Sequence, residues 1–374
     1  MWSVRELFNP VITRVLLYGA NPFDNEYVLK RMEEINVISG KQIKGTWVSE
    51  WTKKADRYIS LADKALEDGN KLSAEQYYRF ATQCFYACYM INSDDIEEKR
   101  NVYEKLKTYY AKSLEYGTTR YEQMELEITD AKIPGYLLYP DQEKFAAPYP
   151  CVMIYAGIGS CKEELDMLAR PLLERGIAAM FCDQPGTGAA LFDYGVTLSG
   201  KKIDETMRAM EAYLTACEDI DDQHLAAYGL CMGGGYAVHG AVISSKVQCC
   251  VSLFPLFLGA SKMDSIPLWM KQGKWSNFQY GNPDGLEDFL GNMAILEQGT
   301  FDADYFMVYS PDDNWMSTQA SETLFAMAQG HKESYLLDDK PSFASEETIM
   351  HAMPVGEQLH WVKIMAADWI KKHI

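Results

Sequence analysis

Residues 226–237, with the sequence AAYGLCMGGGYA, constrain the fold more than any other part of the chain. An apolar run typical of a short buried strand leads into a turn of small residues, and a segment compatible with a helix follows. This order, with a cysteine inside G-x-C-x-G, is that of a nucleophile elbow, in which the nucleophile occupies a strained turn. Gly229 and Gly233 are expected to let the strand and the helix approach closely. The pattern predicts Cys231 as a nucleophile.

The helix predicted after Cys231 would point its N-terminus at the sulfur, which would stabilise a thiolate and lower the pKa of the thiol. The alternative is a glycine-rich packed turn that carries an ordinary buried cysteine. A nucleophile also needs a base, and the base needs a group that orients it. The downstream residues offer both, and they favour the nucleophile.

The composition limits the class of protein. The chain has 374 residues, which is enough for an α/β domain and an additional region. Its 53 acidic and 35 basic residues give a net charge of −18, so we expect no binding to nucleic acid or to a membrane. The N-terminal segment lacks the layout of a signal peptide, and no apolar stretch is long enough to span a bilayer. Nine cysteines without C-x-x-C pairs suit a reducing compartment, and we expect a cytoplasmic protein.

Two regions differ in pattern. Residues 1–118 are predicted to form a helical N-terminal cap region, because apolar and aromatic side chains recur there at helical spacing. Residues 119–374 begin with a β-hairpin and then alternate apolar strands with helices, which is typical of a mostly parallel α/β sheet. The predicted elements include a helix over 162–175 and a last strand over 335–337. Residues 256–300 break the alternation and are interpreted as an insertion or lid over the site.

The orienting acid is expected after the strand that lies two beyond the elbow strand, since the chain order in this sheet type is nucleophile, acid, histidine. That strand is predicted over 305–309, and the loop after it contains two adjacent aspartates. Asp313 is at the position where the carboxylate belongs, and Asp312 is a close alternative.

The histidine is expected in the loop between the last strand and the final helix, and His351 meets this condition. His360 falls inside the predicted final helix, and His331 precedes the last strand. His224 lies at the entrance of the elbow strand, and His239 lies along the helix after the elbow. The sequence therefore predicts a Cys-His-Asp triad with His351 as the base.

An oxyanion hole needs two backbone N–H groups directed at the oxygen that becomes negative. One is expected from Met232, directly after the nucleophile. The other is expected from the loop after the strand at 151–155, at Gly157 or Ile158. This assignment follows from the architecture more than from the identity of the residues.

Several stretches carry a resemblance to a known family. They are the helical N-terminal part with Tyr18-Gly19 and Trp47 to Trp51, AGIGSCKEE at 156–164, FCDQPGTG at 181–188, the elbow, and ADWI at 367–370. With these the chain resembles the α/β-hydrolase superfamily, in the branch that contains bacterial dihydroxypseudooxynicotine hydrolase and fungal pigment-pathway chain-shortening hydrolases. The resemblance implies an α/β-hydrolase fold whose helical part caps the active site. It also implies cleavage of a carbon–carbon bond in a β-diketone-like or polyketide ketone.

Two positions depart from the pattern of this branch. Cys231 stands where the branch usually has serine, and Ala189 stands where an acidic residue often follows Gly-x-Gly. Cysteine at an elbow resembles dienelactone hydrolases and some acyltransfer enzymes. A thiolate forms an acyl thioester, which is slower to hydrolyse when water is weakly activated and better suited to transfer onto another nucleophile.

The expected function is hydrolysis of an acyl bond in a medium-sized aromatic or polyketide-like carbonyl compound. The rivals are an acyltransferase or cyclase that uses the same cysteine, and a binding protein on a degenerate hydrolase fold. The sequence contains no Rossmann fingerprint, Walker loop or metal-ligand cluster, so no cofactor or metal is implied. A homodimer is compatible with the sequence, and the branch often forms one.

Overall fold

The computed structural model of the chain describes residues 4–34, 40–91, 95–157, 159–256, 299–311, 313, 316–337 and 356–374. Ile158, Asp312, His351 and residues 257–298 of the expected insertion lie outside the described residues. The chain divides into two compact units, Met1–Thr119 and Arg120–Ile374, and each is described by itself.

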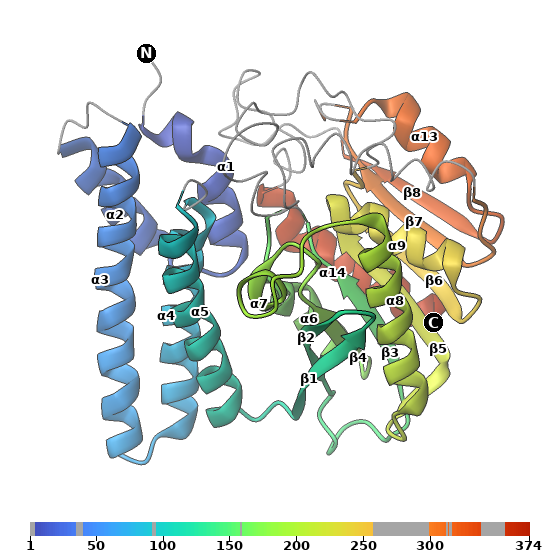
Figure 1. Ribbon diagram of the computed structural model, residues 1–374, viewed down its shortest axis with the longest axis horizontal. Helices are drawn as coiled ribbons and strands as arrows, with labels where there is room; N and C mark the ends of the chain where they lie inside the picture. The colour runs from blue at the N-terminus through green and yellow to red at the C-terminus, as the bar shows by residue number, and fades with distance from the viewer. Residues whose placement is uncertain are drawn as a thin grey trace. The chain divides into compact units, whose positions relative to one another are not determined.

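The first unit is helical. Its described elements are α1 (Val4–Leu17), α2 (Pro22–Glu34), α3 (Gly40–Glu67), α4 (Lys71–Ile91) and α5 (Ile96–Tyr116). Short connections make α3, α4 and α5 antiparallel neighbours, as Figure 1 shows. The helical character expected for this region is confirmed.

Two tryptophans at helical spacing belong to the core of the first unit. Trp47 and Trp51 on α3 are completely buried. The indole N–H of Trp47 donates to the Ala87 carbonyl of α4 at 2.9 Å, so burial leaves this polar atom satisfied. Helix α5 begins at the N-cap Asp95, whose side chain accepts the first free N–H groups of the helix.

The second unit is built on one twisted sheet. Its strands are β1 (Tyr121–Ile128), β2 (Ala131–Leu138), β3 (Tyr149–Tyr155), β4 (Ala178–Cys182), β5 (Ile220–Leu230), β6 (Val247–Leu253), β7 (Asp304–Tyr309) and β8 (Lys332–Leu336). They lie in the order β1-β2-β4-β3-β5-β6-β7-β8. The strands from β4 to β8 pair in parallel, whereas the β1–β2 hairpin joins β4 antiparallel. The predicted hairpin and mostly parallel sheet are confirmed.

Helices cover both faces of this sheet. They are α6 (Asp166–Leu173), α7 (Gly188–Phe192), α8 (Gly200–Ala216), α9 (Met232–Ile243), α13 (Thr318–Ala326) and α14 (Gly356–His373), with a 3-10 turn, η1 (Lys162–Leu165), ahead of α6. In Figure 1 α8 and α9 lie in front of the sheet and α14 lies behind it. Helix α14 packs against α6, β6 and β7. Because both faces are covered, strands such as β4 are apolar throughout and fully buried.

Two element boundaries differ from the sequence prediction. The helix expected over 162–175 begins as the 3-10 turn η1, whose first N–H, that of Lys162, donates to Asp183, and α6 ends at Leu173. The last strand begins at Lys332 and ends at Leu336, earlier than the predicted 335–337. It is the edge strand of the sheet and is largely exposed, so it shows no apolar run.

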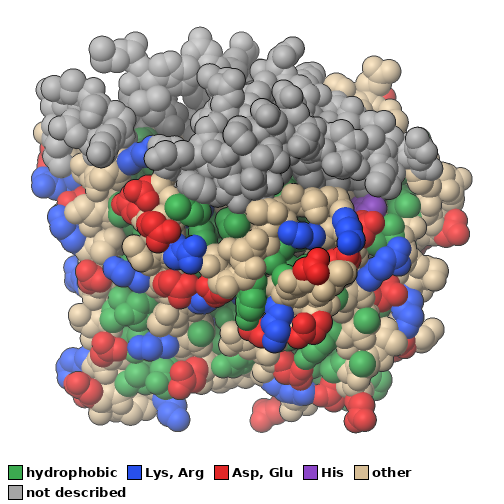
Figure 2. Space-filling view, viewed as in Figure 1, with side chains coloured by type: hydrophobic (Ala, Val, Ile, Leu, Met, Phe, Trp, Pro, Cys, Tyr) green, Lys and Arg blue, Asp and Glu red, His purple; other side chains and the backbone are tan. Residues whose placement is uncertain are grey.

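Acidic and basic side chains are mixed on the surface. Figure 2 shows Lys and Arg side chains among Asp and Glu side chains on the visible face, without a patch of one sign among the coloured residues. Among the helices that the structure describes, none combines the length and the apolar character needed to cross a bilayer.

The elbow between β5 and α9 is a tight junction of backbone against backbone. A Cβ added to Gly229 would lie 1.9 Å from the Gly233 carbonyl oxygen, and one added to Gly233 would lie 2.1 Å from the Tyr155 carbonyl oxygen of β3. Backbone atoms cannot give way as a flexible side chain can, so both positions require glycine. This confirms the predicted close approach of strand and helix.

Gly229→Ala is predicted to lower the free energy of unfolding by about 3 kcal/mol or more, because the new methyl group overlaps backbone. Gly195→Ala is the matched control in the same unit. Its added Cβ meets nothing within 4 Å, and only the positive φ of 66° is strained, which costs about 1 kcal/mol. Urea unfolding of both variants measures the difference, and equal midpoints would contradict the steric account.

Candidate active site

Cys231 is the single residue between β5 and α9, and its backbone has φ 61° and ψ −127°. Positive φ is unusual for a residue with a Cβ, and such strain is typical of functional sites. The backbone on either side is fixed, since the Cys231 N–H donates to the Leu253 carbonyl at 2.9 Å and its carbonyl accepts from the Leu256 N–H at 2.9 Å. The side chain is half-buried. The fold therefore holds the sulfur of a reachable cysteine in one place.

The loop after β3 lies against the Cys231 side chain. A Cβ added to Gly157 would lie 3.7 Å from the Cys231 sulfur and 3.3 Å from its Cβ. Met232, on the other side, is the first residue of α9, and the first N–H groups of a helix have no partner within it. Both predicted sources of oxyanion donors thus adjoin Cys231, while Ile158 itself lies outside the described residues.

Asp313 is buried in the segment that follows β7. Its N–H donates to the Ser310 carbonyl at 3.3 Å, and its Oδ1 accepts from the Met316 N–H at 3.0 Å. Strands β5, β6 and β7 are parallel neighbours, so Cys231 and Asp313 follow the carboxyl ends of strands at the same edge of the sheet. This is the edge where open α/β sheets bind their ligands.

The histidine predicted for the triad, His351, lies outside the described residues, between β8 and α14. His360 lies in α14, inside the predicted final helix, and it is exposed. The other four histidines form pairs with carboxylates: His224 with Asp221, His239 with Asp204, His331 with Glu333, and His373 with Asp304.

A buried cluster of charges next to this edge was not predicted from the sequence. Lys162, Glu163 and Asp183 have side chains that are at most 1% exposed. The ammonium of Lys162 lies 2.9 Å from a carboxylate oxygen of each acid. Asp183 also accepts from the backbone N–H of Lys162 at 3.0 Å and from that of Ala189 at 2.8 Å. One carboxylate therefore joins the loop after β3 to the loop after β4.

The charge state of this cluster follows from its surroundings. Burial by itself lowers the pKa of Lys162, but the carboxylates of Asp183 and Glu163 raise it more, so the pKa is held well above its ordinary value. The lysine stays charged inside the protein. A signal was present in the sequence, since the charged run Lys162-Glu163-Glu164 follows a glycine-rich loop directly after an apolar strand.

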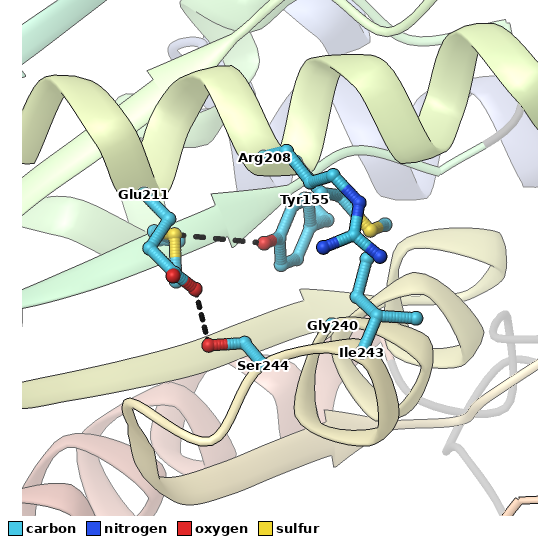
Figure 3. Close-up of a pocket in the computed structure, with 8 residues that line it drawn as sticks. Tyr155, Arg208, Glu211, Gly240, Ile243 and Ser244 are labelled. Carbon is cyan, nitrogen blue, oxygen red and sulfur yellow. Dashed lines mark hydrogen bonds between the residues drawn. The ribbon is translucent and has the colours of Figure 1, made fainter.

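A small cavity lies away from Cys231, between β3, α8 and α9 (Figure 3). Its lining residues are Met153, Tyr155, Met207, Arg208, Glu211, Gly240, Ile243 and Ser244. The Tyr155 hydroxyl donates to the Met153 sulfur at 3.7 Å, and the Ser244 hydroxyl donates to Glu211, as Figure 3 shows. A volume of about 10 Å³ has room for one water molecule at most. It is a packing gap and not a substrate site.

Lys162→Met is predicted to lower the free energy of unfolding by about 3–5 kcal/mol, because it leaves two buried carboxylates without their cation. The control is Lys144→Met, which removes the exposed pair between Lys144 and Asp141 and is predicted to leave the unfolding midpoint unchanged. Urea unfolding followed by circular dichroism compares the two. A Lys162→Met protein as stable as the control would refute the anchoring role of the cluster.

Comparisons with known proteins agree with this architecture. The family model described as Esterase FrsA-like matches residues 30–265. The 2,6-dihydropseudooxynicotine hydrolase of Paenarthrobacter nicotinovorans is 26% identical over 207 residues, which are 55% of this chain and 54% of the relative. Hydrolyase ccsE of Aspergillus clavatus is 28% identical over 268 residues, which are 65% of this chain and 59% of the relative. The chain thus spans between half and two thirds of the length of these relatives.

Solved structures show the fold. The crystal structure of the 2,6-dihydroxy-pseudo-oxynicotine hydrolase superposes with a TM-score of 0.77 at 20% identity, covering 96% of this chain and 95% of that one. The structure of AbyA5 superposes with a TM-score of 0.59 at 14% identity, covering 87% and 88%. The sheet order and the elbow are those of an α/β-hydrolase fold. With a family model that matches more than half of its residues, this chain belongs to the FrsA-like esterase family.

Proposed function

We propose that the protein is a hydrolase that cleaves an acyl bond through an acyl-cysteine intermediate. Cys231 is the nucleophile, His351 the general base and then the general acid, and Asp313 the group that orients the imidazole. The observation that carries this proposal is the strained backbone of a half-buried cysteine at the elbow. Family membership supports the hydrolase class.

The reaction follows from these roles. The thiolate of Cys231 attacks the substrate carbonyl, and the negative oxygen accepts hydrogen bonds from the backbone N–H of Met232 and from that of Ile158 or Gly157. Collapse of this adduct breaks the acyl bond, and protonated His351 gives its proton to the leaving carbon, oxygen or sulfur. Water then attacks the thioester with His351 as base, which releases the acid and restores the thiol.

The proposed substrate is a medium-sized aromatic or polyketide-like carbonyl compound. The bond is the C–C bond of a β-diketone-like ketone, or an ester or thioester. The names hydrolase and esterase among the relatives support an acyl bond, and they do not choose among these three. Aryl esters, aryl thioesters and β-diketones are therefore the probe substrates.

A second candidate function is acyl transfer or cyclisation by the same cysteine. Cysteine at the elbow in place of serine favours it, because a thioester can pass its acyl group to an amine, a hydroxyl or a carbanion. Product analysis with and without an added acceptor separates the two functions. A hydrolase yields the free acid with and without the acceptor. An acyltransferase yields mainly the acylated acceptor when the acceptor is present.

Cys231→Ala is predicted to lower kcat/KM for a responsive probe substrate by about 10³-fold or more, because the nucleophile of the covalent step is lost. Cys217→Ala is the matched control, since Cys217 is also half-buried, and it is predicted to keep the rate of the unchanged protein. Initial rates and product analysis measure both. Undiminished turnover by Cys231→Ala would exclude the acyl-cysteine mechanism.

Asparagine substitutions separate the two adjacent aspartates. Asp313→Asn is predicted to lower kcat by about 10²–10⁴-fold, because an amide cannot orient and stabilise the imidazolium as a carboxylate does. The amide oxygen can still accept from the Met316 N–H, which preserves the loop. Asp312→Asn is predicted to change kcat only slightly. The reverse order of effects would move the role of orienting acid to Asp312.

A further inference from the structure

His331 and Glu333, close together in the sequence, converge with the distant His373 at the edge strand of the sheet. His331 precedes β8, Glu333 lies on β8, and His373 ends α14. One potential ligand atom from each lies within 4.8 Å of the other two. The His331 Nε2 is 2.7 Å from the Glu333 Oε1, and the His373 Nε2 is 3.9 Å from the same oxygen. Among the described residues this is the group that meets the geometric condition for a metal ion.

The His373 ring has an unsatisfied nitrogen directed into this group. Its side chain is 10% exposed, and its Nε2 has no hydrogen-bond partner among the described residues. Trp369 stacks on the ring with centroids 4.0 Å apart, which holds the ring in place. A buried polar atom without a partner is costly, and a metal ion would satisfy it.

Asp304, at the start of β7, positions both histidines. Its Oδ2 accepts from the His373 Nδ1 at 2.7 Å, and its Oδ1 accepts the backbone N–H of His331 at 3.0 Å. With its proton on Nδ1, His373 presents the lone pair of Nε2 toward Glu333. A carboxylate that binds the far nitrogen of a ligating histidine is a recurrent feature of metal sites, where it fixes the tautomer and the ring orientation.

The distances between the potential ligand atoms are compatible with a tetrahedral site. Bonds of about 2.0–2.1 Å place neighbouring ligand atoms about 3.3 Å apart. The observed separations of 2.7 Å and 3.9 Å lie on either side of this value. The ring of His331 stacks nearly parallel to that of His373, and it would have to turn so that its nitrogen faces the ion. Its side chain is 53% exposed, which leaves room for that rotation.

We propose that His331, Glu333 and His373 bind a divalent transition metal ion of the zinc type, with water in the fourth position. Two imidazoles and one carboxylate are ligands that suit Zn²⁺ and Co²⁺. The ion would link the edge strand β8 to the last turn of α14, and Asp304 would connect it to β7. The sequence implied no metal, because His331 and Glu333 alone form no recognisable metal motif and His373 is distant along the chain.

The place of this site in the fold gives it a structural role. Asp304 and His331 lie at the amino ends of β7 and β8, whereas Cys231 and Asp313 follow the carboxyl ends of parallel strands. The metal site therefore lies at the amino ends of the strands, and the candidate active site lies at their carboxyl ends. The ion is expected to stabilise the fold and to take no part in the reaction.

The test is titration of the whole 374-residue chain with Zn²⁺ alone and then with Co²⁺ alone. The protein is first stripped with a chelator, and its thiols are alkylated. We expect one equivalent of the ion to bind. Binding is expected to raise the thermal unfolding midpoint, because the ion binds only the folded state. Bound Co²⁺ is expected to show the intense visible bands of four-coordinate Co²⁺. His373→Gln and Glu333→Gln are each expected to weaken binding by about 100-fold or more, and Asp304→Asn by about 10–100-fold.

His224→Gln is the matched control, because His224 forms a histidine–carboxylate pair with Asp221 at 2.7 Å and belongs to no three-residue group among the described residues. It is expected to bind like the unchanged protein. Two variants at different positions guard against loss of folding, which circular dichroism also monitors. The absence of a one-equivalent site, or unchanged affinity in both ligand variants, would overturn the proposal.

Discussion

The contact of backbone with backbone at the elbow determines the rest of the second unit. Because Gly229 and Gly233 carry no side chain, α9 begins directly against β5 and β3, closer than any other residue would allow. The chain makes this sharp turn with a positive φ at Cys231. The sulfur is thereby held at the carboxyl edge of the sheet, beside Gly157. Strain at one residue is offset by close packing around it.

A second constraint fixes the loops that follow β3 and β4. Asp183 accepts hydrogen bonds from the backbone N–H groups of Lys162 and Ala189, and its carboxylate forms an ion pair with the Lys162 ammonium. The glycine-rich loop that approaches Cys231 is therefore anchored at its far end by a fully buried ion pair. Such a pair contributes little net stability compared with an apolar core of the same volume, but the loss of one partner is costly. The conformation of the loop is thus specified more strongly than glycine-rich sequence alone would specify it.

Local patterns predicted more of this protein than long-range ones did. The elbow could be predicted because the glycines that permit it are adjacent to Cys231, and the hairpin and apolar strands because their signals are contiguous. The edge strand β8 was misplaced because its side chains are exposed, so no apolar run marks it. Strand order determines two other contacts, which are the pairing of Lys162 with Asp183 and the convergence of His331 with His373. No spacing along one chain reports such tertiary neighbours.

The central claim is that Cys231 is an activated nucleophile, and the rate of its alkylation tests this most directly. Cys217 and Cys231 are half-buried, whereas the other seven cysteines are buried, so accessibility alone predicts similar labelling of these two. Brief iodoacetamide treatment at mildly acidic pH, followed by peptide mass spectrometry, gives the rate at each thiol. We predict that Cys231 reacts much faster than Cys217, and that His351→Ala removes the difference. Equal rates at the two cysteines in the unchanged protein would contradict the account.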